Sequence, residues 1–166
     1  MPLLLAGVPL VALLLAKRGK RRSRGAGSGG SVDVAKVTST DLGELLPDVR
    51  PRVEAVLAGL RSQGFDPRVY ETYRSPERAD YLKDKGVSKA GRASYHVKRR
   101  AVDIIDNRRD SKGDRILWGA PMHKGADTER KAKADAFFQA LGRLVEANGG
   151  TWGGRWSFYD PAHGQW

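Results

Sequence analysis

The chain has 166 residues, 40% of them hydrophobic, which is enough for one folded domain with a sizeable core. It contains no cysteine, which excludes disulfide bonds and thiolate metal sites, so any metal ion must be held by His, Asp or Glu. Its formal net charge of +11, from 30 basic and 19 acidic residues, favours contact with anionic lipids, anionic envelope polymers or nucleic acid.

The first 31 residues differ in composition from the rest of the chain. Residues 1–16 form a short hydrophobic segment, below the roughly 20 apolar residues that span a bilayer. The basic run that follows predicts a reversed membrane anchor, and the alternatives are an unstructured extension or a misassigned start codon. Residues 17–31 form a basic and Gly/Ser-rich linker. We therefore expect membrane or anionic-polymer contact through residues 1–24 and one folded domain over residues 32–166.

The first half of this domain predicts helices around a strand. Residues 41–60 indicate a helix, which Pro51 either interrupts or restarts. Its apolar residues recur at helical spacing: Val53, Val56, Leu57 and Leu60. Residues 68–73 are rich in strand-forming residues. Ser75, followed by proline, predicts the start of a short helix that runs to about Lys85.

The second half predicts a strand and a long helix. Residues 101–105 form a short apolar run with one acid, Asp103, which is typical of a buried strand. Residues 127–148 predict the clearest helix, and two glycines follow as its stop. Four apolar residues fall on one of its faces: Ala134, Phe138, Leu141 and Val145. Helices followed by strands interleaved with helices indicate an α+β domain.

The three histidines are His96, His123 and His163, and two of them lie near acids. His96 precedes Asp103 by seven residues, and His163 follows Asp160 by three. A zinc hydrolase needs three protein ligands, an open position for water and a carboxylate that takes the proton of that water. Two His and one Asp as ligands, with a second Asp as base, meet this requirement, although such spacings are common by chance.

Asp103 is the most informative of these acids, because Val102, Ile104 and Ile105 surround it. An ionised carboxylate in an apolar strand is costly unless it is paired or bound to a metal ion. The alternative interpretation is an ion pair with a neighbouring arginine. His123 lies in a polar stretch and is predicted to be a surface residue.

Three motifs occur in the order found in a known family. They are Tyr73-Arg74-Ser75 with Glu77-Arg78, then Ser94-Tyr95-His96 with Ala101-Val102-Asp103, then Trp152-Gly153-Gly154-Arg155-Trp156 with Asp160-Pro161-Ala162-His163. They resemble segments of the D-alanyl-D-alanine carboxypeptidases and phage L-alanyl-D-glutamate endopeptidases, which are zinc peptidases of the cell wall. The resemblance covers residues 73–163 and implies a single α+β domain with a small antiparallel sheet flanked by helices.

The resemblance also implies roles for five residues. One zinc ion would be held by His96, Asp103 and His163. Asp160 would be the catalytic base. Arg74 would stabilise the charge that develops on the reacting carbonyl oxygen, whereas without the motif a surface ion pair would be the preferred interpretation.

Further residues are assigned less directly. Ser94 would contact substrate or orient the first histidine ligand, and Trp156 would bind substrate. Trp152 and Trp156 are either part of a groove for the wall peptide or part of the core. Two positions depart from the family pattern: Arg99 stands where glycine is usual, and Gly164 stands where an aromatic residue is usual.

The resemblance implies zinc-dependent hydrolysis of peptidoglycan stem peptides. Cleavage at L-alanyl-D-glutamate is preferred, because the compact chain and the Trp-Gly-Gly ending look closest to phage lysis enzymes. The alternatives are a D-alanyl-D-alanine carboxypeptidase and a non-catalytic peptidoglycan-binding module. No nucleic-acid motif accompanies the basic runs, so we expect no specific nucleic-acid partner and a monomeric protein. The location stays open between a bacterial membrane and a virion or host envelope.

Overall fold

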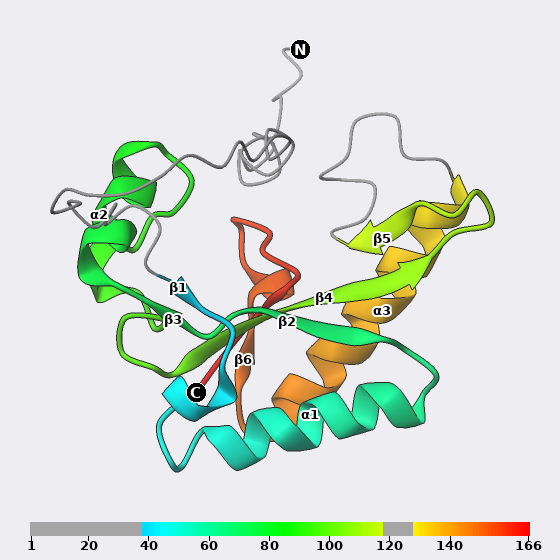
Figure 1. Ribbon diagram of the computed structural model, residues 1–166, viewed down its shortest axis with the longest axis horizontal. Helices are drawn as coiled ribbons and strands as arrows, with labels where there is room; N and C mark the ends of the chain where they lie inside the picture. Colours follow the sequence, from blue (N-terminus) through cyan, green and yellow to red (C-terminus); the bar gives the residue numbers. More distant parts are fainter. Residues whose placement is uncertain (1–37, 118–127) are drawn as a thin grey trace, which may run out of the picture.

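The computed structural model describes residues 38–117 and 128–166 (Figure 1). The predicted hydrophobic segment, residues 1–16, and linker, residues 17–31, lie outside this part of the chain, as does His123. Within the described residues, no helix has the length and hydrophobicity that a membrane span requires. The anchor and the boundary of the domain therefore stay predictions.

Two long helices and a short 3-10 helix contribute residues to the core. A 3-10 helix, η3, covers Leu42–Glu44, and helix α1 covers Arg50–Ser62 with Pro51 in its first turn. The predicted helix over residues 41–60 is thus shorter at its start, because Asp41 caps η3 instead of continuing into α1. Helix α3 covers Thr128–Ala147, close to its predicted bounds.

The strands alternate with short helical elements. Strand β1 is Thr38–Ser39, β2 is Pro67–Glu71, β3 is Tyr73–Arg74, β4 is Ala101–Arg109, β5 is Arg115–Leu117, β6 is Thr151–Trp152 and β7 is His163–Gln165. Helix α2, Pro76–Asp84, follows β3, and the 3-10 helices η4 and η6 cover Gly91–Ala93 and Gly153–Arg155. Ser75 caps α2 as predicted, since its side chain accepts the Arg78 amide at 3.2 Å.

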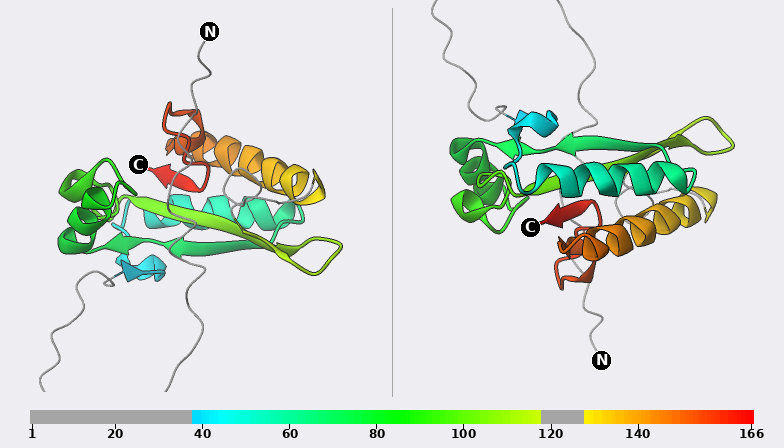
Figure 2. Two further views of the ribbon diagram at one scale, coloured as in Figure 1. Left: turned by 90° about the horizontal axis from the view of Figure 1, so that it is seen from above. Right: turned by 90° about the horizontal axis from the view of Figure 1, so that it is seen from below.

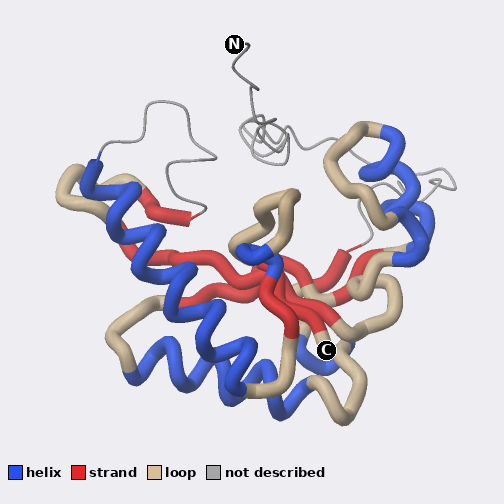
Figure 3. Tube along the Cα trace, turned by 180° about the vertical axis from the view of Figure 1, so that it is seen from behind, coloured by secondary structure: helices blue, strands red, loops and turns tan. Residues whose placement is uncertain are grey.

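The larger sheet is antiparallel and has five strands in the order β2-β4-β7-β6, with β5 paired to the far half of β4. Helices α1 and α3 pack on each other and on one face of this sheet (Figures 1 and 3). The core joins the predicted apolar face of α1 to Phe137 and Phe138 of α3 and to Val102 and Ile104 of β4. The predicted α+β fold with a small antiparallel sheet is confirmed.

Strand β4 is central and connects two ends of the molecule. Helix α2 and η4 lie at the end where β4 begins, and the β4–β5 hairpin lies at the other end (Figure 2). The strand continues past its predicted end at Ile105 to Arg109, because pairing with β5 extends it through polar residues. At its beginning, Asp103 lies between Glu71 of β2 and His163 of β7 in register. Side chains of directly paired residues point to the same face, so these three share one surface of the sheet.

Candidate metal centre and catalytic groups

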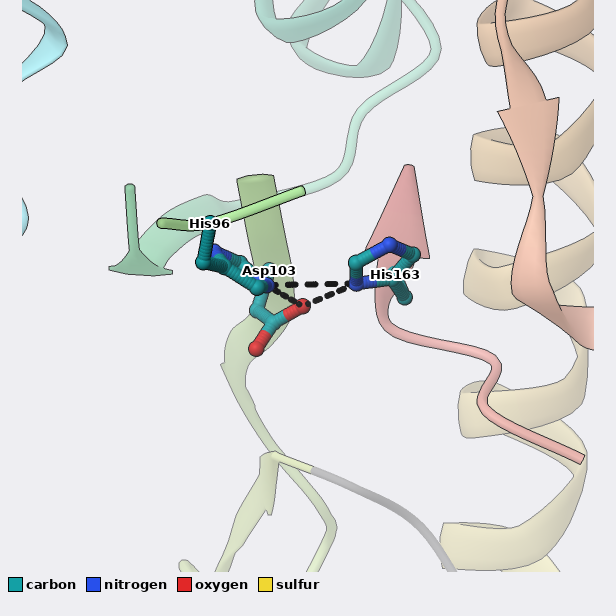
Figure 4. A group of neighbouring side chains, drawn as sticks. All are labelled: His96, Asp103 and His163. Atoms are coloured by element: carbon teal, nitrogen blue, oxygen red, sulfur yellow. Dashed lines mark hydrogen bonds and ion pairs between the residues drawn. The ribbon is translucent and has the colours of Figure 1, made fainter. Parts of the chain in front are cut away.

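Three buried side chains converge at the beginning of β4 (Figure 4). His96 comes from the turn after η4, Asp103 from β4 and His163 from β7. Asp103 Oδ1 lies 3.2 Å from His96 Nε2 and 3.0 Å from His163 Nδ1. The two ring nitrogens lie 3.2 Å apart. The structure thus brings together the three residues that the resemblance assigned to one metal ion.

The outer nitrogen of each imidazole has its own acceptor. His96 Nδ1 lies 3.2 Å from the carbonyl oxygen of Thr72. His163 Nε2 lies 3.2 Å from Oε1 of Gln165. Because a carbonyl oxygen can only accept, each outer nitrogen carries the ring proton, and this fixes the tautomer. The inner nitrogens, His96 Nε2 and His163 Nδ1, then present bare lone pairs to each other.

A cation satisfies this geometry. Two bare imidazole nitrogens and a carboxylate oxygen face one another at hydrogen-bond distance, and in these tautomers no proton lies between them. Three acceptors so placed repel one another unless a positive charge is shared among them. Two His and one Asp form a nitrogen and oxygen donor set that suits a zinc-type divalent ion and leaves room for a further ligand. The donor set therefore fits the metal that the family implies.

The same electrostatics governs the protons of these groups. When protons instead of a metal ion supply the positive charge, burial still opposes ionisation of Asp103, but the charge of protonated His96 and the hydrogen bond from protonated His163 hold the pKa of its carboxyl well below the ordinary value. Burial likewise opposes the protonated form of His163, yet the hydrogen bond to Asp103 and its charge raise the pKa of the imidazole. The site thus attracts positive charge strongly, which is the property that metal binding needs.

The turn that carries His96 is held by local contacts and contains strained backbone. Ser94 Oγ accepts the amide of His96 at 3.3 Å, which supports the orienting role among the two predicted for Ser94. Arg99 ends the turn at φ 59°, a left-handed conformation that favours glycine. Its guanidinium lies 5.1 Å from the ring of Tyr73 and 3.5 Å from Glu44. The arginine therefore keeps the turn that glycine would make, at a backbone cost.

The close packing around position 164 gives a reason for the glycine found there. A Cβ at this position would lie 2.9 Å from Val145 Cγ2 and 3.4 Å from the Trp166 ring. An aromatic residue therefore has no space here, because α3 approaches β7 closely. The ring of Trp156 instead lies 5.2 Å from the ring of His163, so an aromatic neighbour of this histidine is supplied from elsewhere in the chain.

Asp160 lies in the segment before β7, beside the grouped ligands. Its backbone is fixed, since its amide donates to Gly153 at 3.1 Å and its carbonyl accepts from His163 at 3.2 Å. Burial and the negative charge of Asp103 raise the pKa of its carboxyl to about 6. Among the described residues, no hydrogen bond or ion pair uses this carboxylate, which leaves it available to a water molecule or a substrate. These are the properties of a general base that works near neutral pH.

Arg74 is buried and forms an ion pair with Glu71, in place of the surface pair left open by the sequence. Its Nε donates to Glu71 Oε2 at 3.0 Å, and its Nη2 donates to the same oxygen. Burial opposes the charged guanidinium, but these bonds and the charges of Asp103 and Asp160 raise its pKa. A permanent positive charge therefore stands next to the ligand and the candidate base.

The remaining predicted residues separate into site and core. Trp156 is half-buried against His163 and so borders the centre. Trp152 belongs to the core, where its indole nitrogen donates to the carbonyl of Pro161 at 2.8 Å. Glu71, a buried acid paired with Arg74, is a residue beside the site that the sequence did not single out. An acid at the end of a run of strand formers, three residues before Arg74, was the available signal.

Comparison with known proteins gives matches in sequence and in structure. Residues 88–166 match the sequence model of a family described as D-alanyl-D-alanine carboxypeptidase. The structure resembles that of the L-Ala D-Glu endopeptidase ChiX of Serratia marcescens with a TM-score of 0.52 and 23% sequence identity, covering 81% of this chain and 92% of that chain. No match was found among curated proteins.

The sequence match and the structural match bear on different parts of the chain. The structural likeness, at its low identity, shows a shared fold over most of the chain. The sequence match begins after α2, so it includes the grouped His and Asp side chains and Asp160 but leaves out Arg74. The resemblance drawn from the motifs is thereby confirmed, since residues 88–166 match the model of the D-alanyl-D-alanine carboxypeptidase family.

Proposed function

We propose that this protein is a zinc-dependent peptidase that hydrolyses the stem peptides of bacterial peptidoglycan. The observation that carries the proposal is the convergence of three acceptors, His96 Nε2, Asp103 Oδ1 and His163 Nδ1, with both histidine tautomers fixed from outside. An ion held there would lower the pKa of a bound water molecule towards about 7.

The protein's own groups would then handle the proton and the developing charge. Asp160 is ionised above pH 6 and has no partner among the described residues, so it can take the proton of the attacking water. As a protonated acid, it can give that proton to the departing amine, which completes the transfer. Arg74 keeps Nη1 free of hydrogen bonds within the described part of the chain and can donate to the carbonyl oxygen as it becomes negative.

Two bonds in the stem peptide are candidates. We favour the bond between L-alanine and D-glutamate, since the fold resembles that of an L-Ala D-Glu endopeptidase and the Trp-Gly-Gly ending is similar to phage lysis enzymes. The second candidate is removal of the terminal D-alanine, which the family description supports. A monomer and contact of residues 1–24 with the envelope stay predictions.

One experiment separates these activities. The full chain is loaded with zinc and incubated with purified peptidoglycan, with and without a chelator, and the released fragments are identified by mass spectrometry. Chelator-sensitive release of new amino termini at D-glutamate supports the endopeptidase, and loss of terminal D-alanine alone supports the carboxypeptidase. A folded, zinc-loaded protein that releases neither product would contradict the proposal and favour the binding module.

A further inference from the structure

Glu71 is a buried acid that the proposed chemistry does not use. It ends β2, is 3% exposed and lies opposite Asp103 in the sheet. Its Oε2 accepts Nε and Nη2 of Arg74, the former at 3.0 Å. Its Oε1 accepts the hydroxyl of Thr38 at 2.6 Å and lies 3.4 Å from Nε of Arg78. Both carboxylate oxygens are therefore occupied.

Burying such an acid destabilises the folded state. Burying a carboxylate beside a second one, here that of Asp103, is unfavourable without a matched cation. Burial and, to a smaller extent, the charge of Asp103 oppose ionisation of Glu71, but the hydrogen bonds and charge of Arg74 reverse the balance, so that the pKa of Glu71 is lowered. A buried ion pair of this kind seldom exceeds a well-packed apolar pair in stability, so stability alone gives little reason for it.

The geometry of the pair suggests another reason. A guanidinium has five N–H donors in one rigid plane. Glu71 uses the edge formed by Nε and Nη2, which fixes that plane and leaves the Nη1 edge without a partner in the part of the chain that the structure describes. The long, flexible stem of Arg74 would otherwise give this charge many positions, each with a lower chance of meeting the substrate.

We propose that Glu71 is a positioning residue, which holds the Arg74 guanidinium so that its open edge is directed to the reacting carbonyl group. This inference rests on the proposed function, because Arg74 acquires its role there. Glu71 itself does not touch the substrate and acts only through the arginine. It therefore affects the rate of the chemical step, while binding of the metal ion is left to the three other residues.

The short strand β1 extends this support. Thr38 and Ser39 pair with Arg74 and Tyr73 in register, and the Thr38 hydroxyl reaches Glu71. The carbonyl of Ser39 accepts both the amide and the hydroxyl of Thr72, at 2.7 and 3.0 Å. The backbone carbonyl oxygen of Thr72 in turn accepts from Nδ1 of His96. One two-residue strand thus steadies the segment that serves both the arginine and the first ligand.

The first test replaces Glu71 with glutamine in the full chain. Glu71→Gln keeps the shape but removes the charge that orients Arg74, so we expect kcat to fall by about 100-fold with KM nearly unchanged. Zinc content per chain should stay at the wild-type value. The matched control is Glu54→Gln, which removes an exposed ion pair of α1 with Arg50 and should leave kcat unchanged. Wild-type kcat in Glu71→Gln would overturn the proposal.

A double variant tests whether Glu71 acts through Arg74. In an Arg74→Ala background there is no guanidinium to position, so adding Glu71→Gln should not lower kcat further. A further loss of about 100-fold in the double variant, equal to that of the single one, would mean that Glu71 acts independently and would overturn the proposal. Circular dichroism and zinc content confirm that each compared protein is folded and loaded.

A spectroscopic test does not depend on activity. The Nε–H signal of Arg74 in a 15N NMR spectrum, assigned with Arg74→Lys, should exchange slowly with water in the wild type and quickly in Glu71→Gln. This result supports positioning even if the wild type releases no product from peptidoglycan, in which case only the proposed function fails. Rapid exchange in the wild type would overturn the positioning role whatever the activity.

The contribution of β1 is tested at Thr38. Thr38→Val removes the hydroxyl at constant shape and should lower kcat several-fold, while Thr38→Ser keeps the hydroxyl and should retain wild-type kcat. Both should retain zinc. Equal kcat in the valine variant and the wild type would remove β1 from the proposal, and equal loss in both variants would attribute the effect to packing.

Discussion

A buried acid lies near each end of β4, Asp103 within the strand and Asp110 directly after it, but the two acids have opposite surroundings. At the far end, Asp110 is met by donors only: the amides of Lys112 and Asp114 on one oxygen, and the guanidinium of Arg130 at 2.8 and 3.0 Å on the other. At the beginning, Asp103 meets two imidazole nitrogens whose protons are engaged elsewhere. Donors of the protein therefore satisfy both carboxylate oxygens of Asp110, whereas the acceptors around Asp103 face one another.

The direction of the hydrogen bonds distinguishes a candidate binding site from a structural ion pair. Both aspartates are buried, one within β4 and one directly after it, so burial and residue type do not separate the two clusters. The direction of the hydrogen bonds does, because each acceptor around Asp110 meets a donor while the acceptors around Asp103 meet one another. The arginine pair that was the alternative for Asp103 is found instead three residues later, between Asp106 and Arg108.

The largest expected effect is the loss of a metal ligand. His163→Ala removes one of three acceptors, so we expect loss of bound zinc and a fall in activity of more than about 1,000-fold. The measurement is zinc per chain by atomic absorption together with peptidoglycan hydrolysis. Arg130→Gln, at the Asp110 end of β4, is the control and should keep its zinc. Full zinc retention in His163→Ala would mean that His163 is not a metal ligand, and the proposed difference between the two ends of β4 would be wrong.

The next effect concerns the base. Asp160→Asn keeps the shape and removes proton uptake, so kcat should fall by about 100- to 10,000-fold while zinc stays bound. Single-turnover hydrolysis of a stem peptide, normalised to zinc content, measures it. Asp114→Asn changes an exposed acid of the hairpin and should retain wild-type kcat. Unchanged turnover in Asp160→Asn would assign the base to another group.

The pH dependence should follow Asp160. A base acts when deprotonated, so kcat/KM rises with pH through the pKa of its carboxyl, which the protein raises to about 6. The charge of a bound metal ion favours the carboxylate and lowers this pKa, so the acid limb should lie at pH 6 or below. A profile of kcat/KM, with zinc content followed at each pH, tests the prediction. A limb well above pH 6 would contradict it.

A smaller effect is expected at the Asp110 end of β4. Asp110→Asn leaves the guanidinium of Arg130 and two backbone amides with a weaker acceptor, so the thermal midpoint should fall by a few degrees. Zinc content and kcat should not change, because this cluster contacts neither the proposed metal ligands nor the proposed catalytic groups. Calorimetry and the hydrolysis assay measure both quantities. Loss of zinc in this variant would show that the two ends are coupled through the strand.

The smallest effect concerns the turn between the first two ligands. Arg99 has a left-handed backbone, which costs an L-residue roughly 1–2 kcal/mol compared with glycine. Arg99→Ala and Arg99→Gly both remove the contacts with Tyr73 and Glu44, so their difference isolates the backbone. We expect the glycine variant to be more stable by about 1 kcal/mol in denaturant unfolding, with equal zinc content. Equal stability of the two variants would mean that the backbone of the turn leaves the left-handed conformation in Arg99→Ala.

The regular elements could be predicted from sequence because their signals are local. The apolar face of α1 and the long pattern of α3 identified both helices, and Ser75 marked the start of α2. The boundaries were less predictable. The polar residues after Ile105 gave no strand signal, and pairing with β5, a tertiary contact, extends β4 to Arg109.

The candidate site was predictable in its members but not in its supports. The motif resemblance singled out His96, Asp103 and His163, which the fold brings together, and their roles stay predictions. Glu71 and Thr72 were not singled out, because a buried acid and a backbone carbonyl have no spacing signature. Their contacts depend on how β1, β2 and the turn of His96 meet in space, which only the fold determines.

The separation of the ligands along the chain has a consequence for the lifetime of the protein. Asp103 and His163 lie 60 residues apart, and the segment between them contains all of α3. An ion bridging them closes this long loop, so its binding energy becomes part of the folding energy, about 2.7 kcal/mol at a free metal concentration 100 times the Kd. Proteases attack the open chain, so the supply of metal in the surroundings would decide how long each molecule survives digestion.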